Sequence, residues 1–185
     1  MSLPLYSLTE LIIFAFRQDG TIVTRDVLLS SLPYIPCDAS WTNDATFRSA
    51  ILDTTNSYRS AHGASALTWD DTLASYALQH TQSCVFQHSG GPYGENLAAG
   101  YASASASVAA WGDEGKQYSC SNPGFSSATG HFTQLVWKAT TKVGCGRVNC
   151  NGSNGTPGWY LTCEYSPAGN IVGNNNQYFK DNVQC

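Results

Sequence analysis

The alternation of apolar and polar residues separates an apolar N-terminal segment from a longer region in which helical patterns precede strand patterns. Between residues 10 and 28, apolar residues alternate imperfectly around Asp19-Gly20, a dipeptide that favours a tight turn, and the pattern predicts a β-hairpin. Residues 32–37 contain two prolines, which disfavour a helix or a central strand and predict an extended linker. We therefore expect an N-terminal extension at residues 1–37 and a folded domain at residues 38–185.

The first half of this domain carries helical patterns. Large or apolar residues recur every three or four positions over residues 44–62, and Gly63 supplies a stop, so we expect an amphipathic helix there. The other expected helices run from a cap at Asp70 or Asp71 toward Cys84, from Ser103 to Tyr118, and over a short stretch from Gly130.

The strand patterns come last. Residues 142–149 and 158–166 alternate, are rich in Val, Trp, Tyr and Leu, and flank a Gly/Asn loop, so they predict an antiparallel hairpin. Helices followed by strands indicate an antiparallel sheet covered by helices, an α+β fold, rather than a doubly wound parallel sheet.

Composition narrows the class of protein. Only 12% of the 185 residues are charged, and the net charge of −4 without any basic stripe argues against nucleic acid. No segment approaches the ~20 apolar residues of a transmembrane helix, and we expect none. Seven cysteines predict disulfides and an oxidising compartment. Two glycosylation sequons begin at Asn151 and Asn154 in a polar loop.

Two motifs carry a family resemblance: Gly-His-Phe-Thr-Gln-Leu-Val-Trp at residues 130–137 and Tyr-Leu-Thr-Cys-Glu-Tyr-Ser-Pro-Ala-Gly-Asn at residues 160–170. They resemble the two signatures of the CAP superfamily, which groups cysteine-rich secretory proteins, antigen 5 and pathogenesis-related class 1 proteins. Over about residues 42–183 the chain is most similar to fungal pathogenesis-related class 1-like secreted proteins. The resemblance implies a three-layer α-β-α sandwich with a central antiparallel sheet and an extracellular location.

Four ionisable residues match cavity positions of that family: His88, Glu95, Glu114 and His131. By resemblance they line one cleft, where imidazoles and carboxylates could hold Zn²⁺ or another divalent cation. Two alternatives stay open: hydrogen bonding that only holds loops together, and hydrolysis. No His-Glu-x-x-His helix and no Gly-x-Ser-x-Gly elbow is present, so no catalytic residue is assigned and we expect no enzyme.

A second candidate site resembles the sterol-binding loop of fungal sterol exporters. Its predicted lipid-binding residues are Tyr118, Cys120, Asn122, Pro123, Gly124 and Phe125. Tyr118 and Phe125 match aromatics of that loop, whereas Cys120 replaces a third, and a flat sterol face is best met by rings or branched aliphatics. Family members also bind fatty acids between two helices.

Plant members of the family imply two disulfides, Cys84 with Cys150 and Cys145 with Cys163. For the remaining three cysteines, we hypothesise that Cys37 pairs with Cys185 and that Cys120 stays free, where it could bridge two chains.

These inferences favour a secreted, non-enzymatic protein that binds sterols or other small hydrophobic lipids, for export or for sequestration in host–pathogen interaction. The alternatives are a metal-dependent hydrolase using the four cleft residues, and an extracellular interaction module. That module would form a homodimer through the N-terminal extension or an unpaired cysteine, because unpaired strand edges invite partners.

Overall fold

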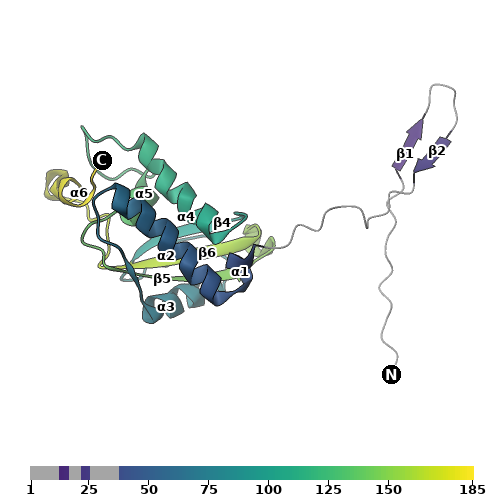
Figure 1. The fold of residues 1–185 in the computed structure, drawn as a ribbon, viewed down its shortest axis with the longest axis horizontal. Coiled ribbons are helices and arrows are strands. Elements are labelled where there is room, and N and C mark those ends of the chain that lie inside the picture. Colours follow the sequence, from purple (N-terminus) through teal and green to yellow (C-terminus); the bar gives the residue numbers. More distant parts are fainter. Residues whose placement is uncertain (1–12, 17–21, 26–37) are drawn as a thin grey trace. The chain divides into compact units, whose positions relative to one another are not determined.

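The computed structural model describes residues 13–16, 22–25 and 38–185. The chain divides into two units, Met1–Pro36 and Cys37–Cys185. In the first unit, strands β1 (Ile13–Phe16) and β2 (Ile22–Arg25) pair antiparallel within the segment for which a hairpin is predicted (Figure 1). The turn dipeptide, the proline linker and Cys37 lie outside the described residues.

The second unit is built on a four-stranded sheet of order β3-β5-β6-β4. Strands β5 (Lys142–Asn149) and β6 (Trp159–Ser166) form the predicted antiparallel hairpin, and β4 (Gly94–Ala99) pairs antiparallel with β6. The two-residue strand β3 (Thr68–Trp69) pairs parallel with β5, so the sheet is antiparallel except at this edge.

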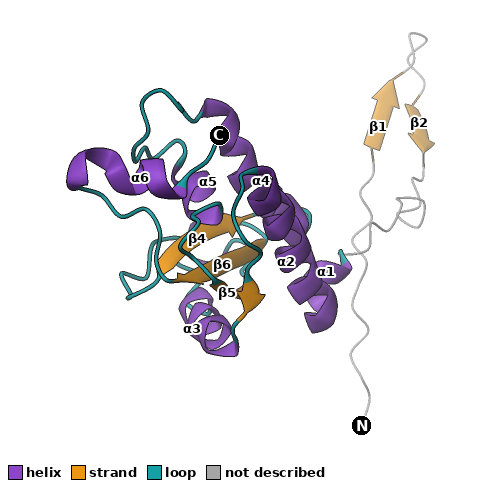
Figure 2. Cartoon of the chain, turned by 60° about the vertical axis from the view of Figure 1, so that its left-hand side comes forward, coloured by secondary structure: helices purple, strands orange, loops and turns teal. Residues whose placement is uncertain are grey.

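Helices cover both faces of this sheet, as Figures 1 and 2 show. On one side lie α2 (Asp44–Ala61), α4 (Ala104–Asp113) and α5 (Gly130–Leu135), whose buried side chains join those of β5 and β6 in the main core. On the other side lies α3 (Asp71–Thr81), capped by Asp70 as predicted. The α+β class and the three-layer arrangement are therefore confirmed.

Two glycines in β5 let α3 approach the sheet at backbone distance. A Cβ atom at Gly144 would lie 2.2 Å from the backbone nitrogen of Ala74, and one at Gly146 would lie 2.2 Å from that of Leu78. Strand alternation therefore places these positions on the α3 side, and the neighbouring Val143 on the side of the main core.

The structure departs from the predicted elements in four places. The predicted helix at 103–118 ends at Asp113, and a 3-10 turn (Glu114–Gln117) follows before the backbone becomes extended at Tyr118. Glycines at positions 112 and 115 weaken the helix there. Three elements were not predicted because each is short and lacks a clear period: α1 (Ala39–Thr42), β4, and α6 (Gln177–Asn182).

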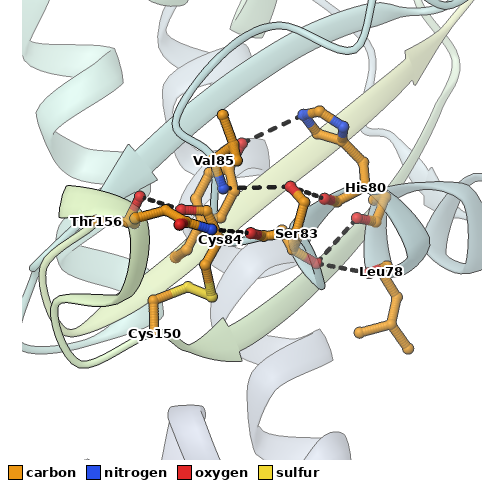
Figure 3. The surroundings of a disulfide bond; sticks show 11 residues. Leu78, His80, Ser83, Cys84, Val85, Cys150 and Thr156 are labelled. Carbon is orange, nitrogen blue, oxygen red and sulfur yellow. Dashed lines mark hydrogen bonds between the residues drawn. A yellow bond between two sulfur atoms is a disulfide. The ribbon is translucent and has the colours of Figure 1, made fainter.

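Three disulfides link cysteines within residues 38–185. The pairs Cys84–Cys150 and Cys145–Cys163 confirm the pairing implied by the plant relatives, and Figure 3 shows the surroundings of the first. The third pair is Cys120–Cys185. The hypothesis that Cys37 binds Cys185 and leaves Cys120 free was therefore wrong, because the fold brings the C-terminal residue to the loop after α4. The predicted disulfide between two chains through a free Cys120 is wrong for the same reason.

One fully buried arginine ties α2 to the turn after α5. The guanidinium of Arg59 donates to four backbone carbonyls, those of Ser65 at 2.7 Å and of Leu135, Trp137 and Thr140 at 2.9 Å. Burial lowers the pKa of Arg59 to about 10, which still leaves it charged at neutral pH. The carbonyl dipoles thus compensate this buried charge without a carboxylate partner.

Candidate functional site

Two histidines are each held by a glutamate through the same ring nitrogen. His88 Nδ1 lies 2.6 Å from Glu95 Oε1, and His131 Nδ1 lies 2.6 Å from Glu114 Oε1. Each carboxylate also accepts backbone N–H groups, Glu95 from Ser89 at 3.0 Å and Glu114 from His131 at 3.0 Å. Because these carboxylates accept, each imidazole donates through Nδ1 and presents Nε2 as its basic nitrogen.

Different parts of the chain supply these side chains. Glu95 lies on β4, Glu114 begins the 3-10 turn after α4, and His131 lies in the first turn of α5. His88 comes from the loop before β4 and is exposed, whereas Glu95 is almost fully covered. The rigid members of the site are therefore the two glutamates and His131, and His88 lies at its open side.

The two pairs share one cleft only in part. A cleft of about 370 Å³ is lined by His88, Glu95 and His131, and Phe125 stands on its wall. Glu114 lines a neighbouring pocket with His131 instead. In the part of the chain that the structure describes, no three His, Cys, Asp or Glu side chains converge to hold a metal ion. The four predicted ligands are thus placed as two hydrogen-bonded pairs and not as one cluster.

Gln134 and Asn170 are among the cleft residues that the sequence did not single out. Asn170 Nδ2 donates to the carbonyl of Gly130 at 2.8 Å, and its Oδ1 accepts from Thr133 at 2.6 Å. Gln134 is buried and accepts from the backbone N–H of Gly169 at 2.9 Å. Both positions belong to the two signature motifs, so the motifs contained the signal, although no periodicity or charge pattern marked these amides.

A buried carboxyl lies behind the cleft. Glu164 on β6 is directly opposite Glu95 on β4, is 1% exposed, and finds no hydrogen-bond donor among the described residues. Burial, together with the adjacent Glu95, raises the pKa of Glu164 to about 9. Burial also opposes ionisation of Glu95, but the hydrogen bonds from Ser89 and His88 outweigh it and lower its pKa. At neutral pH Glu164 therefore keeps its proton, whereas the neighbouring Glu95 is ionised.

The predicted lipid loop surrounds a pocket of its own. A pocket of about 630 Å³ is lined by loop residues together with Val172 and Asn176, and Phe125 is 55% exposed. Five of the six predicted residues line it: Tyr118, Asn122, Pro123, Gly124 and Phe125. Cys120 does not, because its sulfur is committed to Cys185.

The loop is anchored at several points. The ring of Tyr118 packs 5.7 Å from that of Phe132, and burial raises the pKa of this phenol. Phe125 lies against Gly130, where a Cβ would come within 3.1 Å of the ring. Since Phe125 lines both the loop pocket and the His/Glu cleft, the two candidate sites adjoin at this ring.

A sheet covered by helices on both faces, with two His–Glu pairs beside its outer strand, defines the class of protein. The model of the Cysteine-rich secretory protein family (CAP) matches residues 52–165. The chain therefore belongs to the CAP family.

Similar proteins come from yeasts. Protein PRY2 of Saccharomyces cerevisiae is 47% identical over 142 residues, which cover 74% of this chain and 41% of that protein. Secreted protein RBT4 of Candida albicans is 44% identical over 155 residues, which cover 79% of this chain and 43% of that protein. The chain thus spans less than half the length of these two relatives.

Solved structures of the family share the fold. The crystal structure of NaASP2 with Zn²⁺ superposes with a TM-score of 0.58 at 25% identity, covering 74% of this chain and 86% of that chain. Among the helices that our structure describes, none is long and apolar enough to span a membrane.

Proposed function

We propose that this CAP protein is a secreted, non-enzymatic carrier that binds sterols or other small hydrophobic lipids at the loop Tyr118–Phe125. Secretion is supported by its three disulfides, which need an oxidising compartment, and by the names of its yeast relatives. The observation that carries the lipid proposal is the exposed Phe125 ring beside a pocket of about 630 Å³. A pocket of this size is large enough for a drug-sized or sterol-sized ligand.

The surroundings of the loop are uncharged and mix apolar with polar side chains. Residues 117–130 contain no charged side chain, and Val172, 66% exposed, faces the same pocket from another segment. Cys120 removes one aromatic expected in such a loop, but its disulfide fixes the middle of the loop to the end of the chain. Anchoring of this kind lowers the entropy lost when a ligand orders the loop.

The test is competition binding of radiolabelled cholesterol or ergosteryl acetate to wild type and to Phe125→Ala. We expect saturable binding to wild type and roughly tenfold weaker binding to the variant, since half a Phe ring buried against a ligand is worth on the order of 1–1.5 kcal/mol. Leu78→Ala removes an equally apolar, 41% exposed side chain on α3 and should change nothing. Equal affinities for wild type and Phe125→Ala would refute the loop as the lipid site.

We also propose that the cleft binds a divalent cation through His88 and His131. The donor set fits such an ion: each imidazole is oriented by a carboxylate on Nδ1, the arrangement that positions zinc-ligating histidines. Glu95 and Glu114 would then orient the ligands. The crystal of the structural relative NaASP2 contained Zn²⁺, which agrees with this choice of metal. A bound cation would place a positive charge in the cleft beside Phe125.

Calorimetric titration with Zn²⁺ tests this second proposal. His131→Ala should abolish the heat of binding, and Glu114→Gln should weaken affinity by about 10–100-fold, as loss of a positioning carboxylate does. His80→Ala, which removes a histidine outside the cleft, is the matched control. Undiminished binding by His131→Ala would show that the ion binds elsewhere.

The two remaining alternatives, a metal-dependent hydrolase and an extracellular interaction module, have less support than lipid and metal binding. A metal-dependent hydrolase using the four cleft residues would activate a water molecule on the bound cation, so it needs no side-chain nucleophile. Metal-stimulated turnover that is lost in His131→Ala would favour it, and metal binding without turnover would not. For an interaction module the hairpin β1–β2 offers outer strand edges. Light scattering of the full chain and of a form lacking residues 1–36 decides that alternative, because a monomer in both cases removes it.

A further inference from the structure

A third pocket lies beside the outer strand of the sheet and shares no lining residue with the loop pocket. Its volume is about 400 Å³. It is bounded by β4, by one side of α4, and by segments near residues 86 and 157, with walls made mainly of Phe86, Leu97, Tyr101, Trp111 and Pro157. This pocket is mostly apolar and takes no part in the proposed sterol or metal sites except through His131 and Glu114 at one end.

Two large side chains are exposed at this pocket, Phe86 at 53% and Tyr101 at 40%. Both lie in loops that contact the folded core. The Phe86 ring packs 5.5 Å from the buried ring of Tyr160, and the carbonyl of Tyr101 accepts the indole N–H of Trp41 at 3.3 Å. Exposed apolar side chains that gather around a concave surface commonly mark a binding site.

The walls near Phe86 and Pro157 are joined to each other. The disulfide Cys84–Cys150 joins the two segments, and Thr156 Oγ1 donates to the carbonyl of Cys84 at 2.6 Å (Figure 3). Asn154 Nδ2 donates to the carbonyl of Ser83 at 2.9 Å. The pocket is therefore formed before any ligand arrives, which reduces the entropy that binding must overcome.

An extended peptide is a poor occupant of this pocket. A peptide adds to an outer strand through backbone hydrogen bonds. The carbonyl of Leu97, in the middle of β4, already accepts the indole N–H of Trp111 at 3.0 Å. A small molecule that lies on the side chains does not need this carbonyl.

The polar end of the pocket selects the head group of such a molecule. Glu114 accepts from the backbone N–H groups of His131 and Phe132 at 3.0 and 3.1 Å and from His131 Nδ1, and it is partly exposed. A carboxylate placed beside the Glu114 carboxylate would be repelled, whereas a hydroxyl can donate a hydrogen bond to it.

We propose that this pocket is a separate binding site for small hydrophobic alcohols or phenols, with the apolar body against Phe86, Leu97 and Trp111 and the hydroxyl toward His131 and Glu114. Fatty-acid carboxylates are excluded by Glu114. The proposal does not rest on lipid binding at the Phe125 loop, and either site can exist without the other.

Calorimetric titration with 1-octanol and with octanoate tests the proposed alcohol site. The two compounds have alkyl chains of similar length and differ in the head group. We expect saturable one-site binding of octanol and at least roughly tenfold weaker binding of octanoate. Ala110 is a half-buried residue of α4 that lines the pocket. The larger side chain of Ala110→Phe should fill the pocket and abolish octanol binding. Leu78→Ala, which alters an exposed side chain outside this pocket, should leave octanol binding unchanged. Sterol binding that persists in Ala110→Phe separates failure here from failure of the sterol site.

Phe86→Ala alters only an exposed side chain, and it should weaken octanol binding. This variant keeps the proposal testable in case Ala110→Phe does not fold. Glu114→Gln should bring octanoate affinity close to that of octanol. Equal binding of octanol and octanoate by wild type, or octanol binding that survives both pocket variants, overturns the proposal. A wild-type dimer dissociated by Phe86→Ala would also overturn it, because a second copy would then occupy the surface.

Discussion

Replacing Glu164 with Gln should stabilise this protein at alkaline pH. The carboxyl is 1% exposed, lies opposite Glu95 in the β4–β6 register, and has a pKa raised to about 9 from 4.5. Between these two values the folded state holds a proton that the unfolded state releases. The free energy of unfolding therefore falls as pH rises from about 4.5 to about 9.

The magnitude follows from this difference in proton binding. Each pH unit inside the window removes about 1.4 kcal/mol of stability, so the passage from pH 5 to pH 8 costs up to roughly 4 kcal/mol. Gln has nearly the same shape as the protonated carboxyl and stays neutral at every pH. Relative to wild type, Glu164→Gln should therefore be near neutral at pH 5 and stabilised by up to roughly 4 kcal/mol at pH 8.

The assay is urea unfolding followed by tryptophan fluorescence at pH 5, 6.5 and 8, with disulfides intact. The difference between variant and wild type is the relevant quantity, because contributions of other titrating groups cancel in it. Asp53→Asn on α2 removes an exposed carboxylate and reports the general effect of losing one negative charge. A stability difference that stays constant from pH 5 to pH 8 would refute the reasoning, since Glu164 would then not hold a proton in the folded state.

Three further predictions concern the frame of the site. Arg59→Met should cost about 3–5 kcal/mol in denaturant unfolding, because four backbone carbonyls, three of them in buried hydrogen bonds, lose their donor. A loss below about 1 kcal/mol would contradict this role. Cys120→Ser with Cys185→Ser should lower stability by about 2–4 kcal/mol, because the bridge spans 65 residues, and hydrogen exchange should rise in the loop; unchanged exchange would show that the bridge does not order it. Gly146→Ala should cost about 2–3 kcal/mol or more in thermal unfolding, because the added methyl meets the backbone of α3; a neutral effect would mean that the helix shifts freely.

The local pattern of the chain accounts for most of the elements. Helix α2 and the β5–β6 hairpin followed directly from their periods, because one buried face repeats at 3.6 or 2 residues whatever it packs against. Strand β4 could not be found in this way. Its residues include Glu95 and Asn96, and both faces are largely covered only because β6, α5 and the nearby loops surround it.

The candidate site was also only partly predictable from the sequence. The two signature motifs identified His131 and the family, and the resemblance supplied His88, Glu95 and Glu114. It did not say that the glutamates bind the imidazoles in pairs, nor that Phe125 lines both the cleft and the loop pocket. Those relations depend on segments distant in sequence, and hydrogen-bond partners are fixed only when such segments meet.

The sequence by itself determined which residue types and periods the chain carries: two motifs, seven cysteines, and the alternation that makes helices and strands. Tertiary structure alone decided that Cys185 pairs with Cys120 and that Glu164 is buried opposite Glu95. The physical reason is that a disulfide partner and a shifted pKa both depend on distances and burial, and these are set by packing between remote parts of the chain.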